Sequence, residues 1–288
     1  PPPPPAAGGG PPAGGPPGAA PGVASEGPTA DAPPGADHSE NQRCFPPSGG
    51  ALPSTLWCYS LMIPTDYYEL SLIKWQHERQ VSIFACDGYA VYSSDETEIS
   101  DDLVTAKVDS DLKCEKGGEF GTALNVDIFF QVWKKVVNDG DYADYDWTVK
   151  ADPDAVFFPA RLKSVLLAHP IVQGGVYLVN CPRGLHGPVE VFSREAVERL
   201  FYGWEQCTQH FTQQCSGDCM WGEDMFADQC LSKVLGVRCE HDTKILIEDA
   251  CDPPPGWLDC PPSMGDVVSL HPFKTPERYE ACMTSSQR

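Results

Sequence analysis

Positive charge is scarce in this sequence. Its 288 residues include 20 Lys and Arg against 41 Asp and Glu, which gives a formal net charge of −21 at pH 7. Nucleic acids and anionic membrane surfaces attract proteins through clustered Lys and Arg side chains. The acidity therefore argues against nucleic acid or an anionic membrane as a partner. It is compatible with a divalent cation that in turn carries a diphosphate.

Long apolar segments are also missing. No run of 18 apolar residues occurs, so we predict no membrane-spanning helix in this chain. The sequence begins with Pro1 rather than Met. We therefore expect a fragment or a processed product, with an upstream signal or anchor that this chain does not include. Any attachment to a membrane would depend on that anchor.

Large apolar side chains are nearly absent from the N-terminal part. The first 38 residues contain 13 Pro, 9 Gly and 9 Ala, so 31 of the 38 are of these three types. Such a segment cannot bury an apolar face, and we predict a disordered linker or stem over residues 1–43. A tail without function is the alternative. Residues 44–288 are numerous enough for one α/β domain with a substantial core.

Cysteine, in contrast, is abundant, with 13 residues. This density favours an oxidising compartment and several disulfides, and the odd number leaves at least one thiol unpaired. We therefore expect a protein of the secretory-pathway lumen (Golgi or ER) or a secreted one. The connectivity cannot be read from the sequence. A small zinc site at Cys207, His210, Cys215 and Cys219 is an alternative, although their spacing fits no common zinc pattern.

Apolar runs and helical periodicities alternate along the remaining chain. The expected strands cover 56–63, 81–86, 146–151, 174–180, 237–240 and 244–247. The expected helices cover 65–79, 123–138, 159–168 and 223–235, and another begins near 193. Strands that alternate with helices predict an α/β fold with a mainly parallel sheet. Ligands of such sheets bind at the carboxyl ends of strands.

The triplet Asp152-Pro153-Asp154 differs from the other Asp-x-Asp triplets of this acidic sequence in its setting. It lies between the apolar segments WTVKA and AVFF, where carboxylates are costly to bury unless they are paired or bind metal. Two acids one residue apart in a turn can bind one hard cation, Mg²⁺ or Mn²⁺, with phosphate oxygens completing its shell. A structural turn with capping aspartates is the alternative.

Two further groups of polar residues allow both an ordinary and a functional interpretation. Glu223 and Asp224 follow Gly222 at an expected helix start, where the helix dipole favours acids and where a carboxylate could act as a general base. His271 is either a structural hydrogen bonder or a neutral-imidazole ligand of Mn²⁺. Lys274 is either solvated or placed to offset phosphate charge.

The order of these motifs resembles the GT-A glycosyltransferases, and is nearest to the fringe and β1,3-galactosyltransferase group. The resemblance covers roughly residues 56–275: a buried strand ending in Asp152-Pro153-Asp154, then GGVYLVN, GPVEVFSREAVERL, GEDMF at a helix start and a late HPFK. It implies one Rossmann-like GT-A catalytic domain with a mainly parallel central sheet flanked by helices. Two features depart from the group: its usual D-D-D or E-D-D is here D-P-D, and the Cys-rich segment 207–230 is not a general feature of it.

This resemblance also implies an activity and roles for particular residues. The enzyme would be a hexosyltransferase-like, inverting transferase that moves a sugar from a nucleotide-sugar, here a UDP-sugar, to a glycan or glycoprotein acceptor. Asp154 and His271 would be ligands of Mn²⁺ or Mg²⁺, and Asp152 would contact the metal or the ribose. Asp224, or else Glu223, would be the catalytic base.

Asp87 ends the second expected strand, where such enzymes contact the nucleoside.

A retaining enzyme is compatible with the same metal site. A noncatalytic carbohydrate-binding or scaffold protein of this fold is an alternative, against which the intact Asp152, Asp154, Asp224 and His271 argue. The acid and Cys content also suggests an extracellular Ca²⁺-binding adhesion module, but the alternation of strands and helices argues against its usual β-sandwich form.

Overall fold

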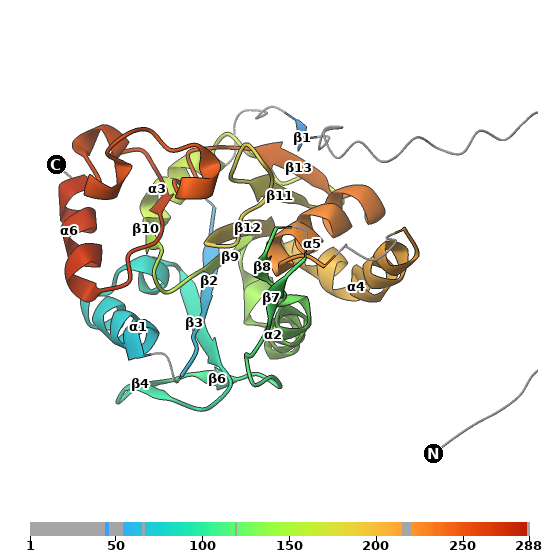
Figure 1. Ribbon diagram of the computed structural model, residues 1–288, viewed down its shortest axis with the longest axis horizontal. Coiled ribbons are helices and arrows are strands. Elements are labelled where there is room, and N and C mark those ends of the chain that lie inside the picture. Colours follow the sequence, from blue (N-terminus) through green and yellow to red (C-terminus); the bar gives the residue numbers. More distant parts are fainter. Residues whose placement is uncertain (1–43, 46–53, 65–66, 119, 215–219, 287–288) are drawn as a thin grey trace, which may run out of the picture. The chain divides into compact units, whose positions relative to one another are not determined.

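The computed structural model describes residues 44–45, 54–64, 67–118, 120–214 and 220–286 (Figure 1). The expected linker 1–43 and two cysteines of the alternative zinc site, Cys215 and Cys219, lie outside the described residues. Within the described ranges, none of the helices has the length and apolar character needed to cross a membrane.

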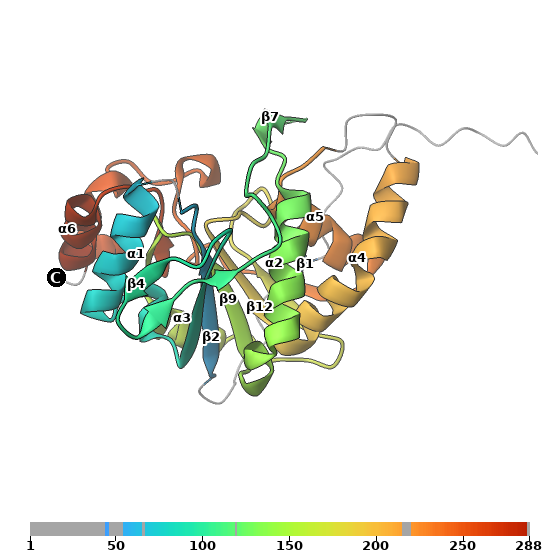
Figure 2. The same cartoon turned by 90° about the horizontal axis from the view of Figure 1, so that it is seen from below.

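A mostly parallel sheet of eight strands forms the centre of the fold (Figures 1 and 2). In spatial order these are β1 (Cys44–Phe45), β13 (Arg238–His241), β11 (Val176–Val179), β12 (Val189–Ser193), β9 (Trp147–Ala151), β2 (Leu56–Leu61), β3 (Gly88–Ser93) and β6 (Ala106–Lys107). Only β12 runs antiparallel to its neighbours, β11 and β9. Every residue of β9, β11 and β12 is buried, as expected for strands covered on both faces.

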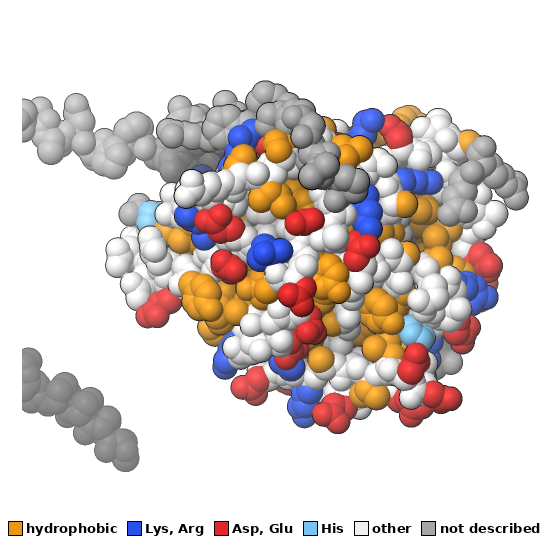
Figure 3. All heavy atoms as spheres, turned by 180° about the vertical axis from the view of Figure 1, so that it is seen from behind, with side chains coloured by type: hydrophobic (Ala, Val, Ile, Leu, Met, Phe, Trp, Pro, Cys, Tyr) orange, Lys and Arg blue, Asp and Glu red, His pale blue; other side chains and the backbone are white. Residues whose placement is uncertain are grey.

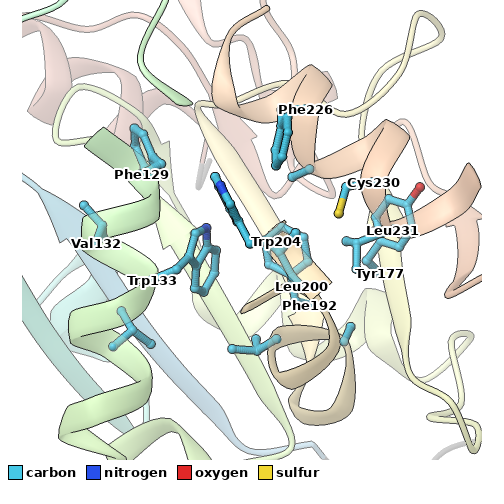
Figure 4. Close-up of a cluster of buried hydrophobic side chains, with 14 of the residues drawn as sticks. Phe129, Val132, Trp133, Tyr177, Phe192, Leu200, Trp204, Phe226, Cys230 and Leu231 are labelled. Carbon is cyan, nitrogen blue, oxygen red and sulfur yellow. The ribbon is translucent and has the colours of Figure 1, made fainter. Parts of the chain in front are cut away.

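Helices cover both faces of this sheet (Figure 2). They are α1 (Tyr67–Arg79), α2 (Val126–Asp139), α3 (Pro159–Leu166), α4 (Arg194–Gln214), α5 (Glu223–Gln229) and α6 (Pro276–Ser286). Alternate residues of a strand point to opposite faces, so Trp57 and Tyr59 pack with α2 and α4, whereas Leu56 and Cys58 pack with α3. Figure 4 shows Trp133 of α2 and Phe226 of α5 pointing into the first of these cores. The expected α/β fold with a mainly parallel sheet is confirmed.

Smaller elements complete the described chain. The short strands are β4 (Glu98–Ser100), β5 (Leu103–Val104), β7 (Lys116–Gly117), β8 (Thr122–Ala123), β10 (Val156–Phe157) and β14 (Ser269–Leu270). The short helices are the 3-10 turns Ser82–Ala85, Asp141–Asp144, Asp249–Cys251, Trp257–Asp259 and Pro262–Met264, and a π-helical turn, Cys230–Val234, that continues α5. The β10–β14 pair is antiparallel and brings the chain after β9 beside the chain before His271.

Four disulfides between described residues confirm the expectation of several. They join Cys58 to Cys86, Cys181 to Cys251, Cys207 to Cys230, and Cys260 to Cys282. Cys207 is therefore engaged in a disulfide, and the alternative zinc site loses one of its four ligands. Cys114 is a free and exposed cysteine.

Two expected strands are wrong, and the first of these errors matters for the site. Residues Ser82–Ala85 form a 3-10 helix, and the second long strand, β3, begins only at Gly88. Ile83 and Phe84 are apolar and are buried in the structure, so the sequence of this segment resembles that of a buried strand. A short apolar run has no periodicity to distinguish a strand from a buried helical turn. The segment 244–247 also forms no strand; only Ile247 makes an isolated bridge.

The surface carries charges of both signs. On the face seen in Figure 3, acidic, basic and apolar side chains are interspersed, and the described part of that face shows no continuous field of Lys and Arg. This distribution agrees with the shortage of basic residues in the sequence.

Candidate functional site

The candidate site lies where the carboxyl end of β9 meets the starts of α2 and α5. A cavity of about 320 Å³ opens there, and Asp152 and Asp154 line it directly after the strand. The Ala155 amide donates to the Asp152 carbonyl at 3.0 Å, which closes a turn between the two acids. The turn directs both acids toward one cavity although the backbone on either side is buried.

Asp152, Asp154 and His271 converge on the wall of this cavity. One ligand atom from each lies within 4.8 Å of the other two. His271 lies at this wall because β14 pairs with β10 and because the Phe273 amide donates to the Asp154 carbonyl at 2.8 Å. Carboxylate oxygens with one imidazole nitrogen suit a divalent cation such as Mn²⁺. The residues present therefore fit the cation that the sequence analysis expects.

His271 is held on both ring nitrogens. Its Nδ1 lies 3.0 Å from Glu248 Oε2, and its Nε2 lies 3.3 Å from Asp154 Oδ1. Burial disfavours the charged imidazole, but the hydrogen bonds to Asp154 and Glu248 outweigh burial and raise the pKa of His271 to about 9. A metal ion must displace the proton from Nε2 to bind there.

Lys150 is a site residue that the sequence analysis missed. It occupies β9, is almost fully buried, and its Nζ lies 2.9 Å from Asp152 Oδ1 and 3.0 Å from Glu223 Oε1. The same ammonium group donates to the Gly187 carbonyl at 2.6 Å and lies 3.7 Å from Glu190. Burial opposes its charge, but Asp152, Glu223 and Glu190 outweigh burial and raise the pKa of Lys150. The sequence contained a signal for this residue, because a lysine inside a largely apolar strand needs buried acidic partners.

Glu223 and Asp224 begin α5, as expected, and take different positions. Glu223 lines the cavity, and its backbone amide donates to Asn125 Oδ1 at 2.9 Å. Asp224 accepts hydrogen bonds from the amides of Gly187 and Met225, at 3.1 and 2.7 Å. Burial, and then the charge of Glu223, raise the pKa of Asp224. Glu223 therefore faces the cavity, whereas Asp224 lies next to it in the chain and outside the set of residues that line the cavity.

Lys274 lines the cavity as the sequence suggested, with its Nζ 5.2 Å from the centre of the Tyr68 ring. Asp87 does not join the site. It precedes β3 at the amino end of the sheet, accepts from the Leu56 amide at 2.7 Å and pairs with Lys163 at 2.7 Å. Asp87 is not among the residues that line the cavity, because the segment before it, expected as a strand, forms a 3-10 turn and leaves Asp87 at the start of β3.

A second hollow lies at the carboxyl ends of β3 and β6. Its volume is about 610 Å³, and Ile63 lines both this hollow and the first cavity. Asp95 and Lys107 line it and lie 3.6 Å apart, and the triplet Asp109-Ser110-Asp111 forms another part of the wall. Asp95, rather than Asp87, is the acid that follows the second long strand.

Comparisons with known proteins show a distant likeness among solved structures. No protein-family model matches the chain, and no curated protein sequence matches it. Among solved structures, the chain is similar to a glycosyltransferase involved in the glycosylation of the major capsid of PBCV-1, with 12% sequence identity and a TM-score of 0.41. The match covers 80% of this chain and 99% of that one. At this level of similarity it assigns neither a family nor an activity to the chain.

Proposed function

We propose that this chain is a metal-dependent glycosyltransferase that moves a sugar from a nucleotide-sugar, with a UDP-sugar as the donor, to the hydroxyl of a glycan or glycoprotein acceptor. The observation that carries this proposal is the convergence of Asp152, Asp154 and His271 on one cavity wall at the carboxyl end of β9. Ligands of parallel sheets bind at this end. The order of sequence motifs that resembles the GT-A enzymes is the second support.

The trio Asp152, Asp154 and His271 would hold Mn²⁺ or Mg²⁺. A bound divalent cation neutralises negative charge on a departing diphosphate, which is the largest charge that develops in such a transfer. Lys274 lies on the same cavity wall and would pair with a phosphate oxygen. Lys150 contributes differently, because its ammonium group is already committed to Asp152 and Glu223 and holds these two carboxylates in place.

Asp224 is our first choice for the catalytic base, with Glu223 as the second. The base must take the proton of the acceptor hydroxyl while that oxygen attacks the anomeric carbon, which gives an inverting transfer. Glu223 is already engaged by the Lys150 ammonium, which lies 3.0 Å from its Oε1. Burial raises the pKa of Asp224, which favours proton acceptance by its carboxylate.

The second hollow would accommodate the nucleoside. It adjoins the first cavity at Ile63, so a nucleotide with its diphosphate beside Asp154 can extend over the ends of β3 and β6. Asp95, rather than Asp87, would then contact the nucleoside. The four disulfides support a lumenal or secreted location for this activity.

A donor screen tests the proposal. The chain would be incubated with a panel of UDP-sugars and Mn²⁺, and release of UDP would be measured with and without EDTA. We expect hydrolysis of at least one donor that EDTA abolishes. Metal-dependent binding of UDP-sugars without hydrolysis or transfer would favour the noncatalytic carbohydrate-binding alternative. Failure to bind any nucleotide-sugar would contradict the proposal.

A further inference from the structure

We infer that Glu248 is a positioning residue that orients His271 and thereby sets the preference of the site for Mn²⁺ over Mg²⁺. The inference rests on the metal site of the proposed function. Glu248 is buried and lies outside the set of residues that line the cavity. It therefore acts on the metal through His271 and not by contact.

The Glu248 carboxylate joins two imidazoles. Its Oε2 lies 3.0 Å from His271 Nδ1, and its Oε1 lies 2.5 Å from His186 Nδ1. With Nδ1 of His271 engaged, the other nitrogen, Nε2, is the one that faces Asp154. A carboxylate on the non-ligating nitrogen of a histidine fixes the tautomer and the orientation of the ring. Glu248 stands in that relation to His271.

Backbone hydrogen bonds and a disulfide fix the chain on both sides of Glu248. Just before it, the Ile247 amide donates to the Ser269 carbonyl at 2.9 Å, and the Ile247 carbonyl accepts from the His271 amide at 3.0 Å. Just after it, the Cys251 amide donates to the Glu248 carbonyl at 3.0 Å, and Cys251 forms a disulfide with Cys181. The backbone of Glu248 is thus fixed relative to that of His271.

The second imidazole is fixed as well. The Asn180 side chain accepts from the His186 amide at 2.9 Å and donates to the His186 carbonyl at 2.8 Å. Asn180 adjoins Cys181, so the same disulfide ties the loop of His186 to the turn that follows Glu248. Glu248 and His186 are thus fixed relative to each other.

An oriented imidazole discriminates between metals. Mg²⁺ takes oxygen ligands almost exclusively, whereas Mn²⁺ accepts a histidine nitrogen readily. Loss of a partner that orients a metal-binding histidine lowers metal affinity by about 10–100-fold. Loosening His271 should therefore weaken Mn²⁺ binding strongly and Mg²⁺ binding little, because Mg²⁺ depends on the two aspartates.

The test is Glu248→Gln in the full chain, with Mn²⁺ affinity measured by electron paramagnetic resonance of the free ion and Mg²⁺ affinity by competition. We expect Mn²⁺ to bind about 10-fold more weakly or worse, with a clearly smaller loss for Mg²⁺. In a His271→Ala background, Glu248→Gln should have no further effect on Mn²⁺. Glu240→Gln is the matched control, because Glu240 is a buried carboxylate that pairs with His169; it should leave Mn²⁺ affinity unchanged.

Equal losses for Mn²⁺ and Mg²⁺, or an undiminished effect in the His271→Ala background, would overturn the inference and leave the metal site standing. If the wild-type chain binds no Mn²⁺, the metal site itself fails, and the inference fails with it. Should Glu248→Gln not fold, His186→Asn removes one side of the bridge instead. It should shift the ratio of Mn²⁺ to Mg²⁺ affinity in the same direction, and an unchanged ratio would count against the inference.

Discussion

The substitution Lys150→Met removes the only positive charge that the described structure places in contact with both Asp152 and Glu223. Methionine fills similar volume, so the change is mainly one of charge. Glu223 and Glu190 would remain buried with no cation beside them. Breaking a buried ion pair by removing one partner costs about 3–5 kcal/mol. Lys150 is only 2% exposed, so solvent screening does not reduce this cost.

Urea unfolding monitored by tryptophan fluorescence measures this loss. For a domain of this size the same change lowers the melting temperature by roughly 6–20 °C, at about 2–4 °C per kcal/mol. The double variant Lys150→Met/Glu223→Gln should recover part of the stability, because it no longer buries the Glu223 charge alone. Stability within about 1 kcal/mol of wild type for Lys150→Met would refute the reasoning, since that is below the cost of a broken buried pair. A double variant less stable than the single one would refute it also.

Three further predictions concern catalysis, pH and redox state. Asp224→Asn should bind UDP and Mn²⁺ normally but lose transfer by about 10²-fold or more, with a milder loss for Glu223→Gln; the opposite ranking in steady-state kinetics would move the role of base to Glu223. Burial opposes the charge of His169, but its hydrogen bonds to Asp242 and Glu240 raise its pKa above 6.5. Its stabilising contribution is therefore fully present below about pH 6.5 and is lost as pH rises through the raised value. The stability difference between wild type and His169→Gln, from urea unfolding at several pH values, should shrink as pH rises; growth with pH would contradict the sign. Mass spectrometry of the native protein should find at least four intramolecular disulfides and alkylation at Cys114, whereas thirteen free thiols would contradict the oxidised state.

Much of the sheet could be predicted from local pattern. The runs that became β2 and β11 are almost continuously apolar, as expected for strands that are covered on both faces. The segment Val81–Cys86 failed because six residues without periodicity fit a buried 3-10 turn equally well. That single error moved Asp87 from the amino end of the sheet to the carboxyl end.

The partners of the site residues were harder to predict. Asp152, Asp154 and His271 could be proposed as a group because the triplet interrupts an apolar segment and because the resemblance supplied the histidine. Glu248 reaches His186 from 62 residues away and His271 from 23 residues away. No local pattern marks such contacts, since they arise only when Ile247 bonds to Ser269 and His271 and when Cys181 joins Cys251.

The central claim is that Asp154 belongs to a metal site that carries a nucleotide diphosphate. Calorimetric titration of UDP into the chain with and without Mn²⁺, for wild type and for Asp154→Ala, tests it most directly, with circular dichroism as the check on folding. We predict Mn²⁺-dependent UDP binding by the wild type and none by a natively folded Asp154→Ala. Unchanged UDP affinity of that variant in the presence of Mn²⁺ would contradict the account.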